Sequence, residues 1–168
     1  MIFVTVGTST TPFDRLLKAI DDLGEREDLV VQHGPSSVRP RSATCFDSMP
    51  FEELTSAIGA ARVVVTHAGV GTVLACLGLG RVPVVMPRLA SLGEAVDDHQ
   101  LELARRLGGI GLVTLVEDEA LLSGIVAQQT RSPAPAPNGR RLAHDLRGYL
   151  MRCIEPDQAR VENRAASS

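Results

Sequence analysis

The sequence contains few aromatic residues and almost no lysine. Four Phe and one Tyr are its only aromatic residues, and the formal net charge of the 168 residues is −3. Neither feature supports nucleic-acid binding, which needs basic surfaces and aromatic rings on which bases stack. The single lysine, Lys18, follows Leu17 and not a glycine. A phosphate-binding P-loop, in which Lys directly follows Gly, is therefore excluded.

Cysteine is also scarce, and its spacing gives no metal-binding pattern. Cys45, Cys76 and Cys153 are far apart and form no Cys-x-x-Cys pair, and the four histidines are scattered. We therefore expect no zinc site. A small, odd cysteine count is typical of a reducing compartment. The N-terminal residues lack the basic start of a signal peptide, so we expect a cytoplasmic protein.

One uncharged run approaches the length of a membrane span. It extends from Val63 to Gly80 without a charged residue. His67 and four glycines interrupt it, its first part is β-branched, and its last part has helical character. A buried strand, a tight turn and a short helix explain this run better than a span does.

Apolar runs that favour strands alternate with helical patterns about six times along the chain. Strands are expected at residues 2–6, 29–33, 43–46, 62–66, 82–86 and 110–116, and helices at 12–23, 50–58, 72–80, 97–107 and 117–129. The strands are mostly continuous apolar runs, which predicts an α/β fold: a Rossmann-like parallel sheet with helices on both faces. Thr11 is expected to cap the first helix, with Pro12 at its first position and Asp14 in capping-box spacing.

The chain is expected to hold one domain followed by a C-terminal extension. Residues 1–130 form the predicted domain, and residues 131–138 form a linker rich in Pro and Ala. A last amphipathic helix is expected at 139–153, packing on the domain or on a partner. The polar tail 154–168 is expected to be disordered.

Ligands of such sheets bind beyond the carboxyl ends of the strands, which singles out the loops after Val6, Phe46, Thr66 and Met86. The first loop, Gly7 to Thr11, has one glycine and four hydroxyls before a helix. It suits an anion near a helix N-terminus, or it is an ordinary turn whose hydroxyls cap the helix.

The segment His67 to Thr72 is a second candidate. Gly69 and Gly71 allow a ligand close to the backbone, and Thr72 lies at a helix start where a phosphate could bind. The third glycine of a dinucleotide fingerprint is absent, because Leu74 stands there. His67 could donate to the same anion, or it is a structural histidine at a strand end.

The segment Gly93 to Gln100 is a third candidate. Asp97 and Asp98 either stabilise a helix N-terminus or belong to a site, and His99 and Gln100 suit sugar hydroxyls. The two acids are adjacent and do not have the spacing of a glycosidase pair.

Together these segments resemble the C-terminal, donor-binding half of GT-B glycosyltransferases of family 28. The likeness is strongest to small cytosolic subunits of two-subunit transferases, including those acting on dolichol-linked GlcNAc and in capsule and exopolysaccharide synthesis. The matching segments are Ile2–Thr8, Pro12–Asp21, Val63–Leu74, Pro83–Arg88 and Gly93–Ala104.

The resemblance implies a role for each matching residue. Gly7, Thr8 and Ser9 would face the donor diphosphate, and the backbone at Phe46 would contact uracil. The diphosphate turn would be His67, Gly69, Gly71 and Thr72, and the sugar loop would be Glu94, His99 and Gln100. His67 is the one candidate for proton transfer, and no catalytic base is identified.

The resemblance also implies an activity. It is that of an inverting UDP-sugar hexosyltransferase that uses no metal and no cofactor. The partner would be a membrane-anchored subunit that binds a lipid-linked sugar or polysaccharide-precursor acceptor and recruits this chain to the inner face of the membrane. Activity would require that partner.

Two departures from the family pattern support an alternative. Ala75 stands where the family usually has a Glu that holds the ribose hydroxyls, and Ser9-Thr10-Thr11 replaces a frequent His-Glu-Gln. A nucleotide-binding or scaffold module without turnover is the second hypothesis. A dinucleotide-dependent oxidoreductase is disfavoured, because Gln32 and His33 stand where the acid at the second strand end would be.

Overall fold

The computed structural model describes residues 1–130. The predicted linker at 131–138, the predicted helix at 139–153 and the predicted tail at 154–168 lie outside the described residues.

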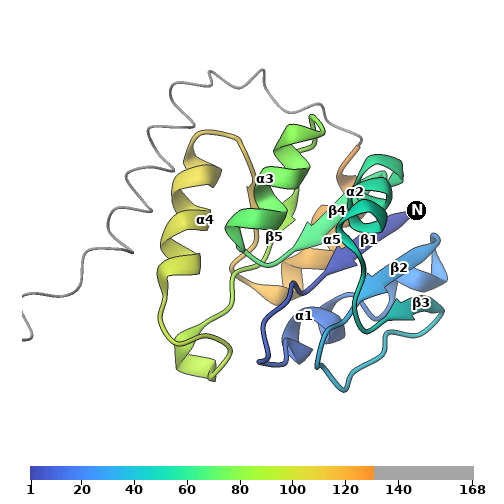
Figure 1. The fold of residues 1–168 in the computed structure, drawn as a ribbon, viewed down its shortest axis with the longest axis horizontal. Helices are drawn as coiled ribbons and strands as arrows, with labels where there is room; N and C mark the ends of the chain where they lie inside the picture. The colour runs from blue at the N-terminus through green and yellow to red at the C-terminus, as the bar shows by residue number, and fades with distance from the viewer. Residues whose placement is uncertain (131–168) are drawn as a thin grey trace, which may run out of the picture. The chain divides into compact units, whose positions relative to one another are not determined.

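Six parallel strands form one sheet in the order β3-β2-β1-β4-β5-β6 (Figure 1). The strands are β1 (Ile2–Thr5), β2 (Leu29–Gln32), β3 (Ala43–Phe46), β4 (Val63–Thr66), β5 (Val84–Val85) and β6 (Thr114–Leu115). This is the doubly wound order, in which the chain direction across the sheet reverses between β1 and β4. The predicted fold class is confirmed.

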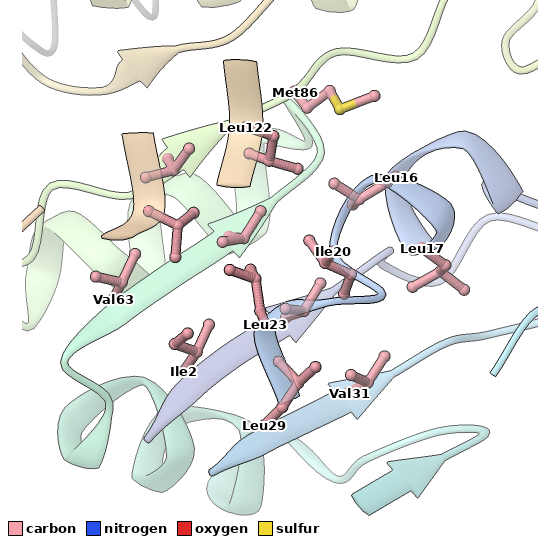
Figure 2. Packing of buried hydrophobic residues seen from close by; sticks show 14 of the residues in the cluster. Ile2, Leu16, Leu17, Ile20, Leu23, Leu29, Val31, Val63, Met86 and Leu122 are labelled. Atoms are coloured by element: carbon pink, nitrogen blue, oxygen red, sulfur yellow. The ribbon is translucent and has the colours of Figure 1, made fainter. Parts of the chain in front are cut away.

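Helices cover both faces of the sheet. The helices are α1 (Asp14–Ala19), α2 (Phe51–Ala60), α3 (Val70–Gly78), α4 (His99–Gly109) and α5 (Leu122–Gln128), with short 3₁₀ turns at Leu23–Glu25, Ala90–Leu92 and Glu119–Leu121. Helices α1 and α5 share a core with Ile2 and Val4 of β1, and Figure 2 shows part of this packing. Helix α2 and Cys76 of α3 share the opposite core with Phe3.

The central strands form because their side chains are apolar on both faces. Every residue of β1 and β4 is buried. Successive strand residues point to opposite faces, so a strand covered on both faces needs a continuous apolar run. The uncharged run 63–80 therefore divides into β4, a turn and α3. None of the helices among residues 1–130 is both long and apolar enough to cross a membrane.

The predicted start of the first helix is wrong. Helix α1 has Phe13 at its N-cap, and no side chain caps it within the helix. The Phe13 N–H instead donates to Ser36 Oγ at 2.7 Å. The acceptor thus comes from the loop after β2, so Thr11 is not needed as a cap.

Several predicted elements are longer than the observed ones. The predicted strands 82–86 and 110–116 contain only the two-residue pairings of β5 and β6. The predicted helix 117–129 begins with a 3₁₀ turn, at which the Asp118 side chain accepts from the Ala120 N–H. Pairing with neighbouring strands sets the bounds of β5 and β6, and the Asp118 cap sets the start of the last helical segment. Apolar periodicity indicates neither.

The strand register places the loops that were predicted to bind a ligand next to one another. Thr5 pairs with Gln32 and with Thr66, Gln32 pairs with Phe46, and Thr66 pairs with Val85. The five strands therefore end side by side, and the loops that follow them emerge at one edge of the sheet.

At the opposite edge, Glu27 and Arg62 form an ion pair. Arg62 donates to both carboxylate oxygens of Glu27, at 2.9 Å from Nε and 2.6 Å from Nη2. Hydrogen bonds from Arg62 lower the pKa of Glu27 to about 2. The pair therefore stabilises the fold above the ordinary Glu pKa, and this contribution is lost as the pH falls towards 2.

Replacement of Glu27 by Gln is expected to lower the free energy of unfolding at pH 7 by about 1–2 kcal/mol. The difference from the unchanged chain should shrink as the pH falls from about 4.5 to about 2. Urea unfolding at several pH values measures it. Glu117→Gln, which breaks an exposed pair with Arg105, is the control and should have little effect. A difference independent of pH would contradict the assignment.

Candidate functional site

A cavity of about 540 Å³ lies at the carboxyl edge of the sheet, where the strand order reverses. We call it the switch-point cavity. It is lined by Thr5, Gly7, Thr8, Gln32, Ser48, Met49, Phe51, Leu54, His67, Gly69, Gly71 and Thr72. Six predicted site residues are thus brought together, from the loop after β1 and the turn after β4: Gly7, Thr8, His67, Gly69, Gly71 and Thr72.

The imidazole of His67 occupies the gap between the two loops. A Cβ atom on Gly7 would lie 2.2 Å from His67 Cε1, and one on Gly69 would lie 2.1 Å from His67 Nε2. Gly7 also has a positive φ of 77°, which L side chains rarely adopt. Both glycines are therefore needed to make room for the ring. By contrast, a Cβ on Gly71 would meet nothing within 4 Å.

His67 is neutral at physiological pH in this environment. Its side chain is buried, and burial lowers its pKa to about 4, with the positive charge of Arg88 acting in the same direction. The backbone of Thr5 opposes this shift. Such a ring can donate one hydrogen bond but carries no positive charge for an anion.

A buried hydrogen-bond network fixes the loop after β1. The Gly7 N–H donates to Thr5 Oγ1 at 3.2 Å, and the Thr5 hydroxyl donates to Gln32 Oε1 at 2.5 Å. Gln32 Nε2 donates to the carbonyl oxygens of Gly7 and Asp47, at 3.2 and 3.0 Å. One amide side chain at the end of β2 therefore connects the loops after β1 and β3.

The N-terminus of α3 opens on the cavity through Gly71 and Thr72. Gly69 is its N-cap and provides no side-chain cap, and the Val73 N–H is the first to donate back, to the Gly69 carbonyl at 3.1 Å. The N–H groups of residues 70–72 thus precede the first intrahelical bond. Free N–H groups and the helix dipole favour a negative charge at this position.

Two other predicted residues lie near the cavity without lining it. Ser9 is exposed, and its Oγ accepts from the Thr11 N–H at 3.1 Å. Phe46 ends β3 with 41% of its surface exposed, and its carbonyl accepts from the His33 N–H. Ser48 and Met49, just after it, do line the cavity.

The predicted sugar-contacting residues are not among those that line the cavity. Glu94 is buried and accepts from Arg15 Nε and Nη2, at 3.0 and 2.8 Å. His99 begins α4 half-exposed, with its Nδ1 2.6 Å from Asp97 Oδ1. Gln100 follows, and its buried Oε1 has no partner. In the described structure, Glu94 therefore holds Arg15 in place.

Sequence reasoning missed Thr5, Gln32, Ser48, Met49, Phe51 and Leu54 as lining residues. Five of them stand near or after the strand ends that were singled out at Val6 and Phe46. Gln32 ends β2, which was not singled out, and strand register places it beside Thr5 and Phe46. No carboxylate of the described residues lines the cavity, and Ala75 of α3 packs against the apolar core. Among residues 1–130, no three His, Cys, Asp or Glu side chains group as metal ligands do.

Gly69→Ala is expected to lower the free energy of unfolding by about 1–3 kcal/mol, because the new methyl group clashes with the His67 ring. Gly71→Ala is the matched control and should leave stability unchanged or raise it by up to about 1 kcal/mol, since it adds a helix former in open space. Thermal or urea unfolding compares the two. The double variant His67→Ala with Gly69→Ala should lose less than the sum of the single losses. Equal effects of the two glycine variants would contradict the packing role of Gly69.

His67 in the free chain is expected to titrate near pH 4, because protonation would place a charge in a buried site near Arg88. Stability should then rise with pH between about 4 and 6.5, where the unfolded chain binds the extra proton. NMR titration of the imidazole, assigned with His67→Gln, measures the midpoint. A midpoint near the ordinary value of about 6.5 would contradict this environment.

Comparisons with known proteins agree with this geometry. A family model described as the glycosyltransferase family 28 C-terminal domain matches residues 1–145. No curated protein matches the chain significantly. Among solved structures, the chain is similar to a glycotransferase of kitacinnamycin, at 20% identity with a TM-score of 0.61, over 88% of this chain and 39% of that one. It is also similar to the glycosyltransferase SnogD from Streptomyces nogalater, at 19% identity with a TM-score of 0.50, over 99% of this chain and 41% of that one.

These likenesses to solved structures show a shared fold, and the chain spans about two fifths of the length of either protein. The family model covers most of this chain. The resemblance noted in the sequence is thereby confirmed: the chain belongs to glycosyltransferase family 28, through the C-terminal domain of that family.

Proposed function

We propose that the switch-point cavity binds the nucleoside diphosphate of a UDP-sugar and that the chain is the donor-binding part of a glycosyltransferase. The observation that carries this proposal is the meeting of the Gly7 loop and the α3 N-terminus at one cavity. A helix N-terminus with free N–H groups, entered through glycines, suits a diphosphate.

The cavity has two chemically different ends, which supports this orientation. The loop residues and α3 supply N–H groups and hydroxyls for a diphosphate. Met49, Phe51 and Leu54 provide an apolar surface for a base, with Gln32 and Ser48 as polar neighbours. In the part of the chain that the structure describes, no Lys, Arg, Asp or Glu lines the cavity. The anion would therefore be held by backbone dipoles.

In transfer, an acceptor hydroxyl would bond to the anomeric carbon as the bond from that carbon to the diphosphate oxygen breaks. The hydroxyl proton would go to a base, and UDP would leave with increased negative charge. The N–H groups at the start of α3 would stabilise that charge as it develops. His67 would contribute a hydrogen bond from its ring or packing against the ligand. We propose that the base that takes the proton from the acceptor hydroxyl lies on another domain. We also propose that the reaction inverts the anomeric centre and uses no metal ion.

Exposed apolar residues near the carboxyl ends of the strands support the proposal that a second domain covers the cavity. Phe46 and Phe51 flank the loop after β3, and Leu92 and Val96 lie in the segment after β5. Exposed apolar clusters are typical of contact surfaces. We propose a membrane-anchored, acceptor-binding partner that recruits this chain to a lipid-linked sugar acceptor.

The lack of a carboxylate in the cavity favours one alternative, a module that binds the nucleotide without turnover. The ribose hydroxyls then have no charged acceptor, because Ala75 stands at the position where the family usually has Glu. Transfer in the presence of partner and acceptor would contradict this alternative, whereas UDP binding without transfer would support it.

Gly71→Leu is expected to abolish UDP binding, because the added side chain fills the space in front of the α3 N-terminus. Gly78→Leu is the matched control: it lies on the same helix, also with no atom within 4 Å of a new Cβ, and is not among the cavity residues. Isothermal titration with UDP and several UDP-sugars measures both. Failure of the unchanged chain to bind any uridine nucleotide, alone or with its partner, would overturn the proposed function.

A further inference from the structure

Arg88 has the largest of the fully buried side chains among residues 1–130, with 1% of its surface exposed. It follows Pro87 just after β5, at the same edge of the sheet as the switch-point cavity. It is not among the residues that line the cavity. A buried arginine needs partners for its donors, and those partners show what it holds.

Among residues 1–130, the guanidinium donates only to main-chain carbonyls. Nη1 donates to Thr11 at 2.9 Å, to Pro12 at 3.0 Å and to Glu94 at 3.3 Å, and Nη2 donates to Val6 at 3.1 Å. Three of these four carbonyls belong to residues 6–12, which carry Gly7 and Thr8. The planar guanidinium group of Arg88 therefore fixes both ends of the loop after β1.

Among residues 1–130, no acid is hydrogen-bonded to the Arg88 side chain, although the charge of Glu94 acts on it from nearby. The carboxylate of Glu94 accepts from Arg15 and from the Leu89 N–H instead. The Phe13 ring, centred 4.6 Å from Arg88 Cζ, and the four carbonyls surround the guanidinium, and Nε has no partner. In a buried position such a charge is little screened by solvent.

The field of Arg88 reaches the cavity. Its charge is one cause of the lowered pKa of His67, whose ring lines the cavity. The same field that disfavours a proton on His67 favours an anion beside it.

We propose that Arg88 is a positioning residue for the diphosphate site, which fixes the loop 6–12 in its binding conformation and supplies a buried positive charge behind it. The proposal rests on the proposed function and adds to it a residue that contacts no ligand. Arg88 acts in two separable ways. Its planar guanidinium fork holds the loop carbonyls by hydrogen bonds, and its charge attracts an anion.

Arg88→Met and Arg88→Lys separate these two contributions. Met removes the charge and the fork, whereas Lys keeps the charge and loses the fork. Arg62→Met is the matched control, because Arg62 also joins distant segments, Glu27 and the carbonyls of Val126 and Gln129, outside the cavity. Three properties are measured on the unchanged full-length chain and on the three variants. They are the UDP affinity, the pKa of His67 and the amide resonances of Gly7 and Thr8.

Arg88→Met should weaken UDP binding by about tenfold or more, raise the His67 pKa and shift the loop resonances. Arg88→Lys should shift the loop resonances while leaving the His67 pKa near that of the unchanged chain, and should weaken UDP binding less. Arg62→Met should lower stability and leave all three readouts unchanged. If Arg88→Met does not fold, Arg88→Lys still tests the role of the guanidinium hydrogen bonds, through the loop resonances and the UDP affinity.

Two results would overturn the proposal: UDP affinity unchanged by both Arg88 substitutions, or equal weakening by Arg62→Met. Failure of the unchanged chain to bind UDP would contradict the proposed function. The loop resonances and the His67 pKa would then still decide whether Arg88 orders the loop.

Discussion

The packing of one imidazole between two glycines sets the geometry of the site. His67 follows β4, Gly7 follows β1, and these strands are neighbours in register at the point where the strand order reverses. The ring fits only because neither Gly7 nor Gly69 has a Cβ. The distance between the two loops, and hence the width of the cavity, is therefore fixed by a side chain that is buried and neutral. Shape and charge are supplied by different residues: His67 spaces the loops, and Arg88 provides the nearby positive charge.

The fold was largely predictable because its strands are continuous apolar runs. Residues 2–5 and 63–66 are buried on both faces, and the sequence shows this directly. Boundaries were less predictable where a distant group decides them. Ser36 provides the acceptor at the start of α1, and no pattern within residues 11–14 indicates it. The two-residue β5 and β6 are likewise set by pairing with neighbours, which apolar runs do not report.

The site was predictable to the extent that it consists of glycines and loop positions. The turn His67–Thr72 and the loop at Gly7 were identified from local motifs, and parallel strand order explains why they meet. Arg88 was not identified, because a lone arginine after a proline suggests a surface position. Its burial depends on carbonyls more than 75 residues away in the chain, at Val6, Thr11 and Pro12. Glu94 was assigned from resemblance alone, and its bidentate pair with Arg15 is a long-range contact of the same kind.

A site made of main-chain N–H groups and missing side chains responds to mutagenesis in an unusual way. Three of the twelve described residues that line the cavity are glycines, and Gly71 and Thr72 bring to it the start of α3, whose first N–H groups precede the first intrahelical hydrogen bond. Alanine at Gly71 adds one methyl group in open space and removes no backbone N–H group, so an alanine scan would leave these donors in place. Substitutions that fill the space in front of the donors are the ones that reveal them. A small effect of alanine substitution at Gly71 is thus no evidence that this surface binds no ligand.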